Sequence, residues 1–186
     1  MAKTGLQEFR DLLSDYKSVS SITIGGAVAA PLADIALRVG PPWPTGVPFI
    51  TATCELLALV YVFHFWFRKS RKRIRKRMIA FLALSAVALV SYLVLSSSYT
   101  FVSPATSNRY VKGFVLRSDV QSVITNAFTE DDALAGAEYD AKEVWKPWSI
   151  TAMEIIILAT WLLLFTSISI FIGAFVMVQR LRIIKK

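Results

Sequence analysis

Eight basic residues occupy ten consecutive positions of this chain, between two apolar stretches that are each long enough to cross a membrane. Moving such a cluster through a bilayer is unfavourable, so basic loops between spans stay on the cytoplasmic side. The run therefore predicts a membrane hairpin whose bend, residues 68–77, faces the cytosol. Its basic residues are Arg68, Lys69, Arg71, Lys72, Arg73, Arg75, Lys76 and Arg77.

The composition is typical of an integral membrane protein. Hydrophobic residues make up 55% of the chain and charged residues 18%, and the mean hydropathy is +0.52. A water-soluble domain of this length needs more polar surface. Four apolar stretches account for the excess, and a hydrocarbon core of about 30 Å needs about 20 helical residues to cross. The stretches run from Ser18 to Val39, Val47 to Phe67, Met78 to Ser98 and Trp148 to Val178.

The distribution of lysine and arginine orients these stretches. If both termini are cytosolic, the cytosolic parts carry fifteen of the 21 basic residues and the outer parts carry six. This bias predicts a multi-pass protein of the inner (plasma) membrane with both termini in the cytosol. The expected fold is all-α, an integral membrane four-helix protein with a small extracytoplasmic helical segment. No cleavable signal peptide is expected, because the segment up to Lys17 is mixed in charge.

Four segments follow from this topology. They are an amphipathic cytosolic helix at 1–17, three transmembrane helices with the basic hairpin at 18–98, the extracytoplasmic segment at 99–147, and a fourth transmembrane helix with a basic cytosolic tail at 148–186.

The extracytoplasmic segment is expected to contain two short helices. Ser118 and Gln121 have the spacing of a capping box, in which each side chain satisfies a backbone N–H of the first turn. A second helix is expected from Glu130 to Trp145, with Thr129 as its N-cap and acids in the first turn, where the helix dipole favours them. Residues 109–116 could be extended.

Three acids inside the apolar stretches are candidates for an ion pathway. Asp34, Glu55 and Glu154 fall about 7 to 12 Å below the outer boundary at the helical rise of 1.5 Å per residue. Charged residues at such depth are costly and usually face a protein interior or water. Copies of the chain around an axis would turn them into an acidic ring that selects cations. Alternatively, Asp34 pairs with Arg38 one turn away, and the two glutamates only hydrogen-bond across helices.

Catalytic and cofactor signatures are absent from the sequence. His64 is the only histidine, so neither a histidine-rich metal site nor a Ser-His-Asp triad can form within one chain. Nucleotide-hydrolysing, dinucleotide-binding and zinc-protease motifs are also missing. We therefore expect no enzyme, no cofactor and no metal site.

The basic hairpin needs polyanions nearby. Anionic lipid headgroups are the default partner, and such a run often serves only to set topology. In a homo-oligomer, several hairpins could instead surround a cytosolic vestibule that captures an oligonucleotide or a nucleotide signal. Phe65, Trp66 and Phe67 lie beside the hairpin and could stack on bases.

This plan of a small size, a few spans and a basic cytosolic surface resembles the small membrane effectors of bacterial antiphage nucleotide-signalling systems, among them the Hailong membrane effectors. The resemblance implies a homo-oligomer, with a tetramer as the expected form. It also implies opening of the membrane under the control of a nucleotide or short oligonucleotide signal, made by a partner nucleotidyltransferase.

The sequence thus predicts a homo-oligomeric membrane channel or membrane-depolarising effector. It would conduct cations and be gated at its basic cytosolic face by a nucleic acid or nucleotide signal, in antiphage defence. The alternative is a non-conducting membrane anchor or scaffold subunit of a larger complex.

Overall fold

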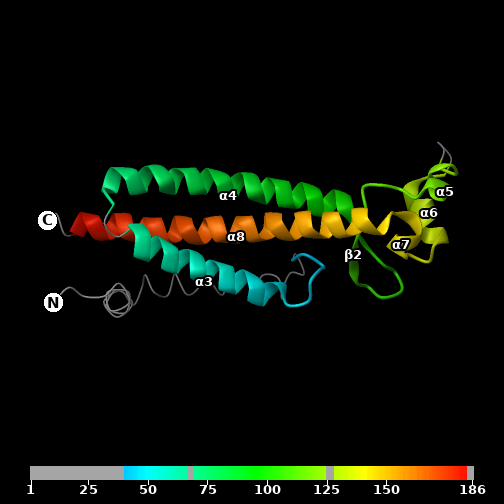
Figure 1. Cartoon of the computed structure of the whole chain (residues 1–186), viewed down its shortest axis with the longest axis horizontal. Helices are drawn as coiled ribbons and strands as arrows, with labels where there is room; N and C mark the ends of the chain where they lie inside the picture. Colours follow the sequence, from blue (N-terminus) through cyan, green and yellow to red (C-terminus); the bar gives the residue numbers. More distant parts are fainter. Residues whose placement is uncertain (1–39, 67–68, 125–127, 184–186) are drawn as a thin grey trace. The chain divides into compact units, whose positions relative to one another are not determined.

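The computed structural model of the chain describes residues 40–66, 69–124 and 128–183 (Figure 1). The predicted helix at 1–17, the predicted first span with Asp34, and Arg68 lie outside the described residues. The chain divides into two compact units. The described parts of the first unit are Gly40 and residues 46–66, 69–89 and 161–183, and those of the second unit are 41–45, 90–124 and 128–160.

Three long helices dominate the described residues: α3 (Val47–Trp66), α4 (Arg71–Tyr99) and α8 (Pro147–Ile183). Each is long and apolar enough to cross a membrane, so three of the four predicted apolar stretches form helices of the required length. The four-helix count stays a prediction, because the first predicted span is outside the described residues. At 37 residues, α8 exceeds the length that a bilayer needs.

The helix α3 has one continuous buried face. Its buried residues recur every three or four positions and are Val47, Thr51, Glu55, Ala58, Leu59, Val62 and Trp66. The opposite face exposes large apolar side chains such as Phe49, Leu57 and Phe65. A helix that is apolar on both faces suits a protein interior on one side and lipid on the other.

The helix α4 is buried only along a narrow stripe. Its buried and half-buried positions alternate three and four residues apart, and they include Ile74, Phe81, Ser85, Ala88, Tyr92 and Ser96. This spacing is that of a helix packed along a single seam. The remaining surface exposes valine, leucine and isoleucine side chains, which leaves it for lipid or for another subunit.

The first unit holds its helices together at a cluster near the basic run. Val62 and Trp66 of α3, Ile74 of α4 and Ala174 of α8 are among its buried members, and Met177 of α8 also belongs to it. Figure 1 shows α4 and α3 beside the α8 turns that carry these residues. The close packing of α3 and α8 uses Gly173, where an added Cβ would lie 3.2 Å from Val62 and 3.3 Å from Leu59.

The bend of the basic hairpin is shorter than predicted. The sequence placed the bend at residues 68–77, but α4 already begins at Arg71. Six of the eight basic residues therefore lie in the first two turns of a helix. Two reasons are local: arginine and lysine form helices well, and Ile74 within the run is fully buried in the cluster described above. The carbonyl of Ser70 accepts the first backbone bonds, from Arg73 and Ile74.

The second unit contains a hairpin that the helical prediction did not include. Strands β1 (Thr100–Val102) and β2 (Arg109–Val111) pair antiparallel, with Phe101 opposite Tyr110. The Arg109 guanidinium donates to the hydroxyls of Ser96 at 2.7 Å and Thr100 at 3.1 Å. The extended conformation expected at 109–116 is therefore confirmed in part, and the connecting segment is mixed rather than purely helical.

The capping box expected at Ser118 is wrong. The helix α5 (Ser118–Gln121) has Arg117 as its N-cap residue, and Arg117 makes no side-chain cap bond. The backbone N–H of Arg117 donates instead to Val144 O at 3.0 Å, and Leu116 pairs with Trp145 as an isolated bridge. Extended pairing therefore reaches Arg117, and Ser118 becomes the first helical residue.

Thr129 is the N-cap that the sequence predicted, but the helix that follows is not continuous to Trp145. It divides into α6 (Glu130–Gly136) and α7 (Ala141–Val144). Glu138 and Tyr139 between them have φ of 51° and 63°, a left-handed conformation that a helix cannot continue through. The Asp140 carboxylate then caps α7 by accepting from Lys142 N at 2.9 Å.

The cap of α6 is a reciprocal one. The Thr129 hydroxyl accepts from Asp132 N, and the Asp132 carboxylate accepts from Thr129 N at 2.8 Å. The backbone N–H of Thr129 and then its hydroxyl lower the pKa of Asp132. Leu134 of α6, Val144, Trp145 and Ile150 form the core of this unit.

Candidate functional site

Glu55 is the most unusual side chain of the first unit. It is 1% exposed on the buried face of α3, among residues that are otherwise mostly apolar. Its Oε2 atom has no hydrogen-bond partner among the described residues. An ionised carboxylate without a partner is very costly in an apolar interior. A cation or a proton at this position would remove that cost.

Thr51, one helical turn before Glu55, is buried and fully satisfied. Its hydroxyl donates to Val47 O at 2.8 Å and accepts from the Trp161 indole Nε1 at 3.0 Å. This second bond joins α3 to α8. Because its donor is already used, the Thr51 hydroxyl cannot also donate to the Glu55 carboxylate.

Two contacts between α3 and α8 bracket Glu55. Thr51 bonds to Trp161 on one side, and Leu59 packs against Gly173 on the other. The two helices run in the same direction, because the contact of the later α3 residue, Leu59, is with the later α8 residue, Gly173. The part of α8 between them contributes a buried hydroxyl, Ser167, which donates to Leu164 O at 2.8 Å.

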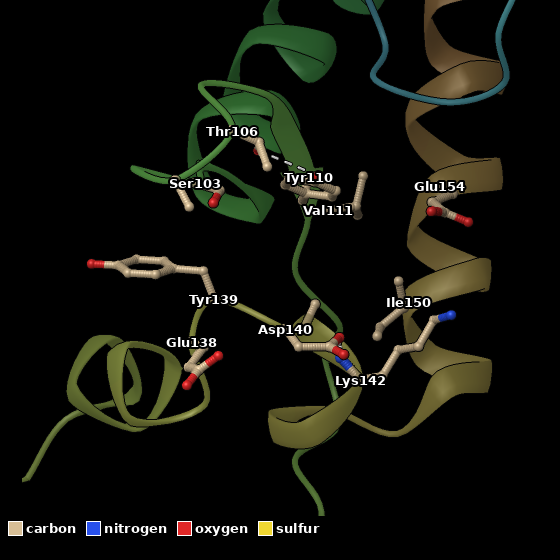
Figure 2. Close-up of a pocket in the computed structure, with 12 residues that line it drawn as sticks. Ser103, Thr106, Tyr110, Val111, Glu138, Tyr139, Asp140, Lys142, Ile150 and Glu154 are labelled. Atoms are coloured by element: carbon tan, nitrogen blue, oxygen red, sulfur yellow. Dashed lines mark hydrogen bonds between the residues drawn. The ribbon is translucent and has the colours of Figure 1, made fainter.

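Glu154 lies in the second unit, in the second turn of α8. It lines a pocket with a volume of about 410 Å³ together with residues of the hairpin and of the α6–α7 turn (Figure 2). Glu55 and Glu154 therefore belong to different units, and Asp34 lies outside the described residues. The acidic ring of the three stays a prediction.

The basic run is exposed around one buried anchor. Its six helical basic residues and Lys69 are all exposed, whereas Ile74 among them is 0% exposed. None of these seven cations pairs with an acid within the described ranges. Arg77 has a different partner: its guanidinium lies 4.9 Å from the centre of the Trp66 ring, a cation–π contact.

Trp66 is the last residue of α3 and is buried. Its ring is 3% exposed and contacts Phe81 of α4, with ring centroids 6.2 Å apart. Its indole Nε1 has no hydrogen-bond partner in the part of the chain that the structure describes. This burial removes the Trp66 face from the base-stacking role that the sequence allowed, while Phe65 remains exposed.

Sequence reasoning found Glu55 but missed its surroundings. The bond between Thr51 and Trp161 joins residues 110 positions apart, and no local pattern indicates it. A signal for Thr51 did exist, since it is a polar residue one turn from Glu55 on the same helical face. No group of three or more metal-ligating side chains lies within the described residues.

Comparisons of the chain with protein-family models, with curated proteins and with solved structures found no match.

Proposed function

We propose that this protein is a homo-oligomeric membrane channel that conducts cations and depolarises the membrane, and that Glu55 lies on the conduction path. The supporting observation is the buried Glu55 carboxyl, which has an oxygen with no hydrogen-bond partner among the described residues. Ionisable residues inside spans typically mark ion or proton pathways. A passing cation would supply the contact that the carboxylate lacks.

Assembly into an oligomer is the second part of the proposal. The helix α4 is buried along one stripe only, and residues such as Leu82, Val87 and Val90 are exposed. This surface is available for a neighbouring copy. Several copies would multiply Glu55 into a ring of carboxylates, which is a common way to select cations. Asp34 and Glu154 are further members of this ring in the proposal, and a tetramer is the expected form.

Gating at the basic face is the third part. Exposed arginine and lysine side chains in the first two turns of α4 form a dense positive surface without acidic partners in the described part of the chain. Such a surface attracts phosphates strongly. A nucleic acid or nucleotide signal from a partner nucleotidyltransferase would bind there, as in antiphage defence. Anionic lipid headgroups compete for the same charges.

Ion flux from purified protein in liposomes tests the conduction path. The Glu55→Gln variant keeps the shape of the side chain but removes its charge, so potassium flux should fall by about tenfold or more, the effect of losing a charge-assisted contact. The matched control is Glu130→Gln, which removes an exposed carboxylate from the first turn of α6. Its flux should equal that of the wild type.

The same assay separates the channel from its alternative. If the wild-type protein carries no current at any ligand condition, the chain is a non-conducting anchor or scaffold subunit. If Glu55→Gln conducts as well as the wild type at equal protein in the bilayer, Glu55 is not on the path.

A further inference from the structure

Glu55 is closed off from water in this structure, although the proposed function needs a cation to reach it. The residue is 1% exposed. A cation in the surrounding water therefore cannot contact the carboxylate in this conformation. If Glu55 lies on the conduction path, the conducting state must differ from this one by an opening beside Glu55. The contacts that hold α3 to α8 on either side of Glu55 decide where that opening forms.

The contact on the Trp66 side of Glu55 is close packing. Leu59 and Val62 lie around Gly173 of α8, where an added Cβ would be 3.2 Å from Val62 and 3.3 Å from Leu59. Val62 and Trp66 also belong to the buried cluster that joins α3 to α4 and α8. Close packing at small residues is a main source of helix association in membranes. We therefore take this side as the fixed one.

The contact on the Val47 side is a hydrogen bond between two buried side chains. The Trp161 indole Nε1 donates to the Thr51 hydroxyl at 3.0 Å, and the two residues are 4% and 1% exposed. Figure 1 shows α3 beside α8, and both residues belong to the first unit. A hydrogen bond depends steeply on distance, so a separation of about half an ångström takes this one beyond bonding range. This contact is therefore lost by a small movement that the packing around Gly173 tolerates.

Loss of this bond leads water toward Glu55. The Thr51 hydroxyl donates to Val47 O within its own helix, so it stays with α3 when α8 moves away. The freed Trp161 N–H then needs a new acceptor, because buried polar groups are normally bonded, and water is the available one. Thr51 and Glu55 are one helical turn apart on the same face of α3, a rise of about 6 Å. Water that satisfies the Trp161 N–H therefore arrives beside the Glu55 carboxylate.

We propose that the Thr51–Trp161 hydrogen bond is the closing contact of the Glu55 site. While the bond is formed, Glu55 is sealed; when it breaks, α3 and α8 part at this contact, with Gly173 as the fixed point, and water and cations reach the carboxylate. The inference rests on the proposed function, because a seal controls flux only if Glu55 lies on the conduction path. Thr51 and Trp161 are positioning residues in this account, not ligands of the ion.

Chemical labelling of Glu55 measures the opening without relying on ion flux. In proteoliposomes of the full-length protein, a water-soluble carbodiimide and glycinamide convert carboxyl groups that water reaches into amides, and mass spectrometry of the Glu55 peptide gives the rate. Wild-type Glu55 should react far more slowly than the exposed Glu130. Trp161→Phe removes the donor and Thr51→Val removes the hydroxyl. Each should speed the labelling of Glu55 by about 3- to 20-fold, the effect of losing one hydrogen bond between membrane helices.

The matched control is Thr53→Val, the same substitution two residues along α3. The Thr53 hydroxyl donates to Phe49 O at 2.8 Å, as the Thr51 hydroxyl donates to Val47 O, but Thr53 is exposed. This variant should label at the wild-type rate. The double variant of Thr51 and Trp161 should react no faster than the faster single variant, because both changes remove the same bond. Two unrelated losses of stability would instead multiply.

Potassium flux from the same proteoliposomes separates this inference from the proposed function. Flux should rise with the labelling rate in both single variants, and the rise should vanish when Glu55→Gln is added. Faster labelling with unchanged flux supports the closing contact and contradicts a conduction path through Glu55. The closing contact is overturned if wild-type Glu55 reacts as fast as Glu130, if neither single variant changes the rate, if Thr53→Val raises it equally, or if the double variant multiplies the two effects.

Discussion

Neutralising part of the basic run is the most informative perturbation of the proposed gate. The four-fold variant replaces Arg71, Lys72, Arg75 and Lys76 by glutamine. All four side chains are exposed in the first two turns of α4, whereas Ile74 between them holds the helix to the core. Removing positive charge from a helix N-terminus does not destabilise the helix, because the helix dipole disfavours cations there. The variant should therefore fold and assemble like the wild type.

The size of the effect follows from counterion release. Each single-strand phosphate that is neutralised contributes about −0.7 to the slope of log affinity against log salt. If each of the four side chains contacts one phosphate, the slope becomes shallower by about 2.8 per chain. Between about 50 and 200 mM salt, the affinity of the wild type should then fall about 50-fold more than the affinity of the variant.

Fluorescence anisotropy with a labelled single-stranded oligonucleotide measures both slopes in detergent-purified protein. A charge-conserving control exchanges arginine for lysine and lysine for arginine at the same four positions, and it should keep the wild-type slope. In the liposome flux assay, the neutralised variant should no longer respond to the ligand. An unchanged slope in the neutralised variant would refute the assignment of these side chains to phosphate contacts. No binding by the wild type at low salt would leave the run as a topology signal and lipid anchor.

Three further predictions concern packing and topology. Gly113→Ala should lower the free energy of unfolding by about 1–3 kcal/mol, and with it the thermal unfolding midpoint. The added Cβ would collide with the Ser149 hydroxyl and lie 2.7 Å from the Trp145 Cβ. The control Gly136→Ala, which meets nothing within 4 Å, should not lower it. Trp161→Phe removes the donor to Thr51 and should cost about 0.6–1.7 kcal/mol in unfolding from detergent; an unchanged midpoint would show that this bond does not stabilise the helix pair. A cysteine placed at Ser107 should react with an impermeant reagent from outside the cell and one at Ser70 from inside; the reverse pattern would contradict the predicted orientation.

The three long helices could be predicted from the sequence because a bilayer imposes one simple demand. About 20 apolar residues must follow one another, and their backbone groups must bond to each other. Length and hydropathy alone therefore identified α3, α4 and α8. The beginning of α4 was harder, since the basic run looks like a loop until Ile74 is seen in the core.

The connecting segment was predicted less well because its local signals compete with longer contacts. Thr129 was identified correctly, since its cap is formed with Asp132 three residues away. Ser118 shows the same kind of local pattern, but the pairing of Arg117 with Val144 overrides it. Glu138 and Tyr139 adopt a left-handed conformation although neither is a glycine, so the sequence gives no sign of the turn. The pocket depends on that turn, so it was beyond the reach of sequence reasoning.

The two polar residues of α3 show how the structure separates a packing role from a functional one. Thr51 and Glu55 lie one turn apart on the same buried face, and both are 1% exposed. The Thr51 hydroxyl donates to Val47 O and accepts from the Trp161 indole, so both of its hydrogen-bonding roles are satisfied and it joins two helices. The Glu55 carboxyl has an oxygen with no such compensation among the described residues. A side chain that only stabilised the helix pair would be better replaced by leucine, which costs nothing to bury. The proposed function accounts for this oxygen as a contact for a cation that crosses the membrane, and the flux of the Glu55→Gln variant tests that account.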